Sequence, residues 1–230
     1  MKDSVPAPVV TRGNSERLLN MKTTNQLLLV ALLLANLTAG AAPATVTTSE
    51  VRALARGNGR VVAVTAAGRL AHSSDGLVWM ERKSKAATLF SVTFGNGSFV
   101  AVGANGAVLT SANGQRWTTR SAGTSTLLRS VAFGHGQFVA VSPSRAILTS
   151  PDGVTWTRRS SGTDSYLTAV AFSDGQFVAV GVSGTCLTSP DGGMWTTSHL
   201  DPTMNLRGIA FGSDNLVRTT PGLASATVRP

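Results

Sequence analysis

Apolar and polar positions follow one recurring pattern along most of the chain. Three copies read SVTFGNGSFVAVG from residue 91, SVAFGHGQFVAVS from residue 130 and AVAFSDGQFVAVG from residue 169. In each copy a strand ends at the first phenylalanine, a glycine-containing turn follows, and an apolar strand returns. The landmark phenylalanines Phe94, Phe133, Phe172 and Phe211 follow one another at intervals of 39 residues. The pattern predicts a repeat protein built from short strands.

Each repeat also holds a third and a fourth strand. A strand such as residues 107–110 leads into a turn of the pattern Ser-x-Asp-Gly-x-x-Trp, and the tryptophan opens the last strand. Residues 53–64 are a fainter copy of the first two strands, with Arg56 in place of the phenylalanine. Four short antiparallel strands in a unit of this length are typical of a propeller blade. We therefore predict an all-β fold, a β-propeller of four-stranded antiparallel blades with four full repeats plus a partial fifth.

The turn phrase consists of residue types that have structural roles. Its Asp or Asn accepts hydrogen bonds from backbone N–H groups, its Ser adds a local bond, and its Gly tolerates a positive φ. Its Trp supplies a large apolar surface between neighbouring blades. Asn113 replaces Asp in the second copy, which suits a turn acceptor and not a catalytic acid or metal ligand. The predicted structural residues are Ser73, Asp75, Trp79, Ser111, Asn113, Trp117, Ser150, Asp152, Trp156, Ser189, Asp191 and Trp195.

The phrase resembles the Asp-box, or bacterial neuraminidase repeat, family, although each copy is one residue shorter before the Trp. Over residues 51–217 the whole unit is similar to the repeats of the photosystem II assembly factor family and of exported bacterial propellers. The resemblance implies a propeller in which the Asp-box turns lie on the face opposite the functional one. It therefore implies a structural role for these turns and a binding or assembly scaffold as the function.

The two ends of the chain differ from the repeats. Residues 1–41 hold a charged start, the apolar run 27–35 and a small-x-small site, which is typical of an export signal. We expect translation to begin at Met21, residues 42–50 to be a linker and residues 218–230 to be a divergent tail. We also expect an incomplete ring, because the fifth repeat loses its pattern after Val217. A truncated or frameshifted reading frame, natural degeneration and dimerisation through open blade edges are the alternatives.

Composition narrows the choice of partners. The formal net charge is +9, and removal of residues 1–41 takes away four basic and two acidic residues, which leaves +7. This excess suits a protein partner or an anionic glycan. Long runs of Lys and Arg are missing, so nucleic acid is not expected, and neither is stable membrane insertion after signal removal. We expect a secreted or periplasmic protein in which Cys186, the single cysteine, is a small buried residue.

The sequence does not favour catalysis. The resemblance to sialidases implies an arginine triad, a tyrosine nucleophile with its glutamate and an aspartate acid/base. The only tyrosine is Tyr166, and the predicted mature region holds only the glutamates Glu50 and Glu81. His72, His135 and His199 occupy three unrelated places in the repeat, which predicts neither a metal cluster nor a triad. We expect no catalytic residues, metal or cofactor; a sialidase-like or other glycoside hydrolase fragment is the alternative.

Basic residues recur in register on the face opposite the turn phrase. Four positions before the landmark phenylalanine come Arg52, Phe90, Arg129, Thr168 and Arg207. These positions begin the innermost strands, and guanidinium groups there suit carboxylate, sulfate or phosphate. The candidate ligand-binding residues are therefore Arg52, Arg129 and Arg207. A second set, Arg82, Arg120 and Arg159, ends the outermost strands, where charge discourages edge-to-edge pairing.

Overall fold

The computed structural model describes residues 51–84, 86, 88–200, 202–209, 216–219 and 224–227. The predicted signal region 1–41, the start at Met21, the linker 42–50 and Phe211 lie outside the described residues. Of the predicted tail 218–230, only residues 218–219 and 224–227 are described. Within the described residues, no helix is long and apolar enough to cross a membrane.

The described residues form four antiparallel sheets of four strands each, which confirms the predicted blades. The first blade holds β1 (Val51–Gly57), β2 (Arg60–Thr65), β3 (Arg69–Ser73) and β4 (Met80–Lys83). The second holds β5 (Leu89–Gly95), β6 (Ser98–Gly103), β7 (Ala107–Ser111) and β8 (Thr118–Ser121), with the 3-10 turn η2 (Ala104–Gly106) between β6 and β7. The third holds β9 (Ser130–Gly134), β10 (Gln137–Val141), β11 (Ile147–Ser150) and β12 (Thr157–Arg159). The fourth holds β13 (Leu167–Ser173), β14 (Gln176–Gly181), β15 (Thr185–Ser189) and β16 (Thr196–His199).

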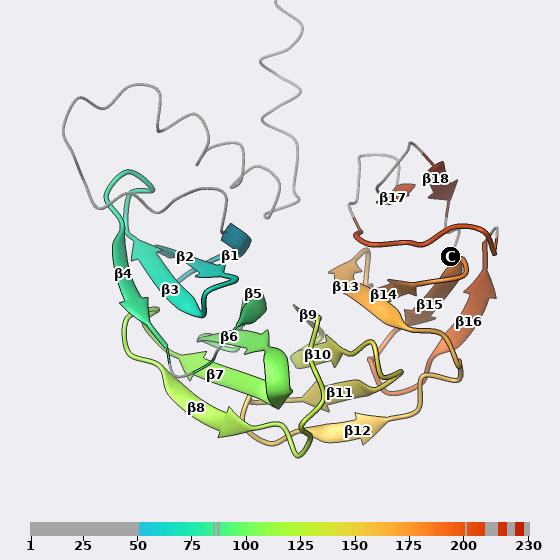
Figure 1. The fold of residues 1–230 in the computed structure, drawn as a ribbon, viewed down its shortest axis with the longest axis horizontal. Helices are drawn as coiled ribbons and strands as arrows, with labels where there is room; N and C mark the ends of the chain where they lie inside the picture. Colours follow the sequence, from blue (N-terminus) through green and yellow to red (C-terminus); the bar gives the residue numbers. More distant parts are fainter. Residues whose placement is uncertain are drawn as a thin grey trace, which may run out of the picture.

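The four blades stand side by side around an open arc (Figure 1). Strands lie in chain order within each blade, so β1, β5, β9 and β13 are innermost and β4, β8, β12 and β16 outermost. The fourth strand of each blade begins one residue after the tryptophan, which shifts the predicted start by one. In the fifth repeat, β17 (Leu216–Thr219) pairs with β18 (Ala224–Thr227) as a separate hairpin.

Three clusters of the core lie between neighbouring blades, and a fourth, Leu54, Ala63, Ala71 and Trp79, belongs to the first blade alone. Val62 and Val64 of the first blade pack with Phe99 and Leu109 of the second, all at most 3% exposed. The same arrangement joins the second blade to the third and the third to the fourth. Trp117, Trp156 and Trp195 border those interfaces, as predicted. Trp79 packs instead on Leu54 and Ala71 of its own blade, because no blade precedes the first among the described residues. Each interface therefore depends on the repeat being kept in both of its blades.

Side chains of the turns after the inner strands join neighbouring blades at one end of the strands. The Nδ2 group of Asn58, in the turn after β1, donates to the carbonyls of Gly97 and Ala112 in the next blade, at 3.1 and 2.8 Å. Asn96 repeats these bonds toward the third blade, and His135 contacts the carbonyl of Pro190 in the fourth. His135 is thus a turn residue, as predicted, and it also joins two blades.

The fourth blade is closed by the chain that follows it. Its buried face consists of Val178, Val180 and Cys186, each at most 1% exposed. Leu206, at 2% exposed, packs against this face together with Met204. Cys186 is therefore the small buried residue that the sequence predicts. The segment 202–209 thus takes the position that the next blade takes in the other interfaces.

Candidate functional site

The strand order gives the arc two faces with different chemistry. One face carries the four turns that follow the third strands, at residues 74–79, 112–117, 151–156 and 190–195, which we call the box turns. The other carries the loops from each second strand to the third and from one blade to the next, such as 104–106 and 160–166. We call it the loop face. Of the predicted binding residues, Arg52 lies in β1 and Arg129 directly precedes β9, both on the loop face. Arg207 lies in the segment 202–209, which forms no strand, so the prediction that it begins an innermost strand is wrong.

The box turns share one hydrogen-bonded geometry. The Asp152 carboxylate accepts from the N–H groups of Val154 and Thr155, both at 2.8 Å, and from the Ser150 hydroxyl at 3.0 Å. The Trp156 indole N–H donates to the Gly153 carbonyl at 3.1 Å. Hydrogen bonds from backbone N–H groups are the main cause that lowers the pKa of Asp152, and the same holds for the carboxyls of Asp75 and Asp191. These carboxylates accept hydrogen bonds from groups within their own turn.

Asn113 makes the same turn without a charge. Its Oδ1 atom accepts from the N–H groups of Gln115 and Arg116 at 2.9 and 3.0 Å. The Ser111 hydroxyl lies 3.3 Å from the same atom. The amide oxygen of Asn113 therefore forms the same turn as the carboxylates of the other blades. The turn itself does not need a charged group.

The second feature of the site is the row of residues four positions before each landmark phenylalanine, on the loop face. We call Arg52, Phe90, Arg129, Thr168 and Arg207 the inner row. The pairing of β1 with β2 skips Arg52, that of β5 with β6 skips Phe90, and that of β13 with β14 skips Thr168. Arg129 directly precedes β9, and its N–H donates to the Val141 carbonyl at 2.8 Å, although Val141 already pairs with Ser130. The shifts in β1, β5 and β13 are β-bulges, which re-aim a side chain at the edge of a sheet, whereas the pairing of β9 with β10 has no shift.

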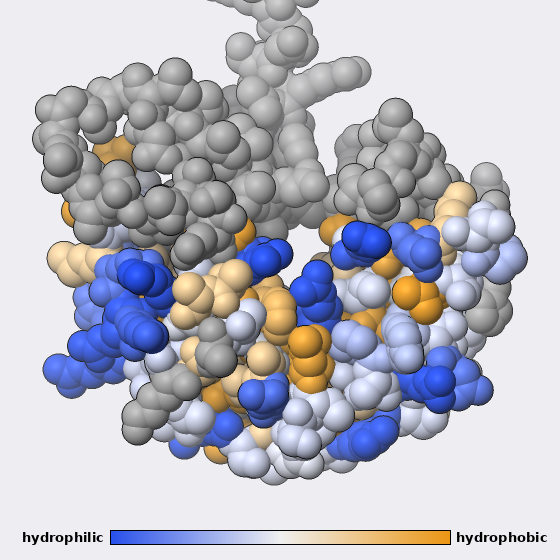
Figure 2. All heavy atoms as spheres, in the orientation of Figure 1, coloured by the Kyte–Doolittle hydropathy of each residue, from blue (hydrophilic) through white to orange (hydrophobic). Residues whose placement is uncertain are grey.

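Contacts between neighbouring strands fix part of the inner row. The Arg129 guanidinium lies over the Phe90 ring, 5.1 Å from its centroid. The Thr168 hydroxyl donates to the carbonyl of Leu206 at 2.6 Å, directly before Arg207. All three arginines of the row are exposed, and hydrophilic side chains border the concave inner edge of the arc in Figure 2. Sequence reasoning gave the arginines but not the aromatic support under Arg129.

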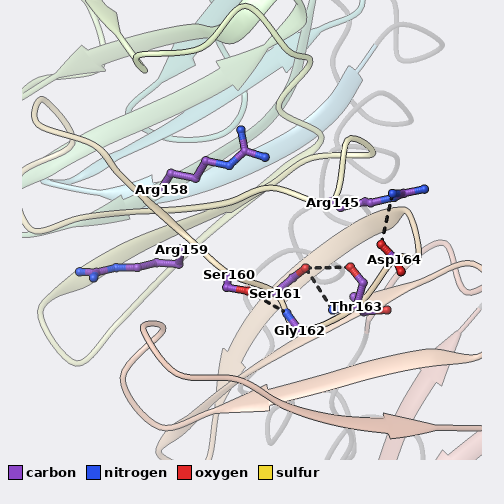
Figure 3. Close-up of a pocket in the computed structure, with 8 residues that line it drawn as sticks. All are labelled: Arg145, Arg158, Arg159, Ser160, Ser161, Gly162, Thr163 and Asp164. Carbon is purple, nitrogen blue, oxygen red and sulfur yellow. Dashed lines mark hydrogen bonds and ion pairs between the residues drawn. The ribbon is translucent and has the colours of Figure 1, made fainter.

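A groove on the same face was not predicted. It lies between the loop after β10 and the loop after β12, has a volume of about 620 Å³, and is lined by arginines and hydroxyl side chains (Figure 3). Arg145 forms an ion pair with Asp164 across it, at 3.2 Å between Nη1 and Oδ1. The signal that would have found it is Arg145 itself, at a repeat position where the other blades carry glycine.

No protein-family model matches the chain, and no curated protein matches it in sequence. Solved structures do resemble it. A structure described as YCF48 bound to D1 peptide superposes with a TM-score of 0.54 at 18% identity, over 71% of this chain and 58% of that one. The WD40 beta propeller domain of Doa1 gives 0.54 at 16% identity, over 73% of this chain and 60% of that one. The computationally designed Ika8 protein gives 0.57 at 18% identity, over 74% and 55%.

The fold is a β-propeller. The comparison rests on shape, because identities this low carry no information about a site. The chain spans between 55% and 60% of the length of these three neighbours.

The outer arginines have structural contacts. The Nε groups of Arg120 and Arg159 donate to the hydroxyls of Thr110 and Thr149, at 3.1 and 3.0 Å. In the first blade the corresponding pair is Arg82 and His72. Burial, followed by the charges of Arg60 and Arg82, lowers the pKa of His72. Its Nε2 atom is buried and has no hydrogen-bond partner in the described part of the chain.

Three further residues bear on the alternative of a glycoside hydrolase: Glu81, Tyr166 and Glu50. Glu81 pairs with Arg69 at 2.7 Å, and Tyr166 is 54% exposed in the loop before β13. Glu50 lies outside the described residues. Among the described side chains, no group of three or more His, Cys, Asp or Glu residues is placed to hold a metal ion.

Proposed function

We propose that this protein is an exported, non-catalytic propeller that serves as a binding or assembly scaffold for a partner protein. The inner row receives an acidic segment of that partner. The observation that carries the proposal is the row itself: β-bulges present its members on β1, β5 and β13, and Arg129, directly before β9, is supported by Phe90. The strands fix the backbone at these positions, so a ligand has to order side chains and not a loop.

The chemistry of the row favours carboxylates. A guanidinium group offers a planar set of donors that matches a carboxylate in two parallel hydrogen bonds. Exposed arginines beside an aromatic ring also suit a peptide that carries both acidic and apolar side chains. The formal net charge of +7 that remains after removal of residues 1–41 would speed the approach of such a partner. The similarity in fold to YCF48, whose structure contains a D1 peptide, supports a peptide or protein partner.

Membership of the Asp-box family and export are parts of the same proposal. The four box turns, with their shared carboxylate or amide acceptor, support the former. The charged start and apolar run within residues 1–41 support a secreted or periplasmic location. Sequencing the N-terminus of the exported protein tests this, and a start near residue 42 is expected. An unprocessed protein retained in the cytoplasm would contradict it.

The binding experiment compares two triple variants by fluorescence anisotropy with an acidic decapeptide and its amidated counterpart. R52Q/R129Q/R207Q is expected to weaken binding of the acidic peptide by about a hundredfold to ten-thousandfold, because each of three lost charge-assisted contacts costs about 1–2 kcal/mol. The control R56Q/R60Q/R116Q removes the same charge near the box turns and is expected to weaken binding less than threefold, roughly the effect of a distant screened charge.

Other outcomes separate the remaining readings. Equal losses in both triple variants would reduce the proposal to a general charge effect and overturn it. Retention of an acidic glycan by the inner row in place of the peptide would move the partner class from protein to anionic glycan. Turnover of fluorogenic sialosides or other glycosides would favour the glycoside hydrolase reading. Light scattering of the mature chain tests pairing of two copies through open blade edges.

A further inference from the structure

One blade departs from the others at a position that glycine otherwise occupies. Five residues before the serine of each box turn, the chain has Gly68, Gly106 and Gly184 in the first, second and fourth blades, with φ of +69°, +66° and +63°. The third blade has Arg145 there, with φ of +67°. A left-handed backbone is strained for an arginine, and such strain often accompanies a functional site.

The loop around Arg145 differs from the corresponding loop of the second blade in a way that accommodates the arginine side chain. In the second blade, a Cβ atom at Gly106 would collide with the backbone carbonyl of Thr124. In the third blade, Pro143 enters the loop, and the Arg145 N–H donates to the carbonyl of Ser142 at 3.1 Å. The Ser142 and Ser144 hydroxyls bond to one another at 2.8 Å. This loop therefore keeps the left-handed turn while directing a guanidinium group toward the loop after β12.

The groove between the two loops holds basic and hydroxyl groups together. Figure 3 shows Arg158 and Arg145 on its two sides, with Ser160 and Thr163 on the loop between them. Its volume of about 620 Å³ is within the range of small-molecule sites, roughly 300–1,000 Å³. Most such sites are apolar, whereas the side chains around this groove are polar or charged. A ligand rich in hydroxyl and anionic groups matches it better than an apolar one.

Asp164 shows how an anion is held in this groove. Its carboxylate contacts Arg145 although its own side chain is 97% exposed, and half of the Arg145 side chain is exposed as well. An ion pair this open to water contributes little, so a carboxylate on a ligand can replace it. Arg159, by contrast, is held at its Nε group by Thr149. Arg145 and Arg158 are thus the arginines available to a ligand.

We propose that this groove binds an acidic saccharide, meaning a short sugar chain that carries carboxylate groups. Arg145 and Arg158 bind its carboxylates, and the hydroxyls of Ser160 and Thr163 bond to its ring hydroxyls. The site is distinct from the inner row, and it does not depend on the function proposed for that row.

Isothermal titration calorimetry with trigalacturonate tests the proposal, with the fully methyl-esterified trisaccharide as the uncharged control. Wild-type protein is expected to bind the acid and not the ester. R145G is the decisive variant, because glycine fits this backbone in three other blades and folding is preserved. It is expected to weaken binding on the order of tenfold or more, and R158Q by a similar factor. D164N removes the competing carboxylate and is expected to tighten binding roughly two- to fivefold.

Two controls locate the effect. R116Q removes an exposed arginine from a box turn, and R52Q/R129Q/R207Q removes the inner row; both are expected to bind trigalacturonate as the wild type does. Unchanged binding by R145G, or a loss of the same size in R116Q, would overturn the proposal. Equal binding of acid and ester would do so too. Capture by phosphatidylglycerol vesicles but not by trigalacturonate, when it is lost in R145G, would replace the saccharide with a lipid headgroup.

Discussion

The guanidinium group of Arg129 lies over the ring of Phe90, 5.1 Å from its centroid, and joins the second blade to the third at the inner edge of the arc. The two residues occupy the same repeat position, one blade apart. Phe90 therefore stands at the repeat position where the first and third blades have an arginine, and its ring supports Arg129 of the third blade. A cation held over an aromatic face keeps its edge free for hydrogen bonds to an acidic group.

Phe90→Leu is expected to weaken binding of an acidic peptide by about two- to fivefold, because an exposed cation–π contact contributes roughly 0.5–1 kcal/mol. Leucine keeps an apolar side chain but removes the π face, so the melting temperature should change little. Fluorescence anisotropy measures the affinity. Phe90→Trp is the matched variant, and it should bind at least as well as the wild type. Identical affinities for the leucine variant and the wild type would rule out a role for this pair.

The box-turn glycines differ in what lies beside them. A Cβ atom on Gly114 would come within 2.7 Å of Val62 Cγ2 in the first blade, whereas one on Gly76 would meet nothing within 4 Å. Both residues have a positive φ, +71° and +81°. Gly76→Ala is therefore expected to cost only the backbone strain, about 1 kcal/mol. Gly114→Ala is expected to cost about 1–3 kcal/mol more, because it overpacks an interface between blades.

Urea unfolding of the two alanine variants measures this difference. The comparison is matched in position and backbone conformation, so the extra loss in Gly114→Ala reports the contact with the neighbouring blade. Equal losses would mean that the blades separate easily enough to admit a methyl group, in contrast to a close-packed core.

Local signals explain why much of the fold follows from the sequence. Several signals act within one repeat and can be recognised in the sequence of a single blade. They are the 39-residue interval, the left-handed turn residues and the Ser-x-Asp-Gly phrase. The hydrogen bonds that Asn58 makes to Gly97 and Ala112 cannot be recognised in this way, because they connect residues of two blades. A turn asparagine in the sequence predicts only the turn.

The candidate site was less predictable for the same reason. The register along the repeat identified Arg52, Arg129 and Arg207, but the bulges that present such residues exist only once two strands pair. Arg145 departs from the repeat, which has glycine at this position in the other three blades, but the sequence does not show what its side chain faces. Its importance depends on the left-handed backbone and on the groove that it shares with the next loop, and both arise from tertiary structure.

His72 makes the first blade sensitive to acid. Burial and two nearby arginines lower its pKa, so below its ordinary value of about 6.5 the unfolded chain binds the proton that the folded chain rejects. Stability should therefore fall as the pH decreases from about 7 toward 5. His72→Thr introduces the residue found at this position in the next two blades, Thr110 and Thr149. Its hydroxyl can accept from Arg82, as those threonines accept from their arginines.

Differential scanning fluorimetry at pH 8 and pH 5 tests the effect of His72→Thr. The variant is expected to raise the melting temperature at both values, and more at pH 5. A gain independent of pH would assign the whole effect to packing and hydrogen bonding rather than to the proton.

The thiol of Cys186 reports on the closure of the fourth blade. Burial raises its pKa to about 11, and its side chain is fully buried beneath a cluster that includes Leu206. We expect the native protein to react slowly with Ellman's reagent, because the Cys186 thiol stays protonated near neutral pH and the reagent cannot reach the buried sulfur atom. Leu206→Ala is expected to cost about 2–4 kcal/mol locally and to accelerate the reaction.

Leu128→Ala is the matched control for Leu206→Ala. Leu128 is the same residue type at the same repeat position, two repeats earlier, and it is fully buried between the second and third blades. Its loss should lower global stability by a similar amount while Cys186 stays protected under native conditions. A larger rate in Leu206→Ala at equal global stability means that segment 202–209 opens on its own. Equal rates in the two variants would show instead that the fourth blade and this segment unfold only together with the rest of the arc.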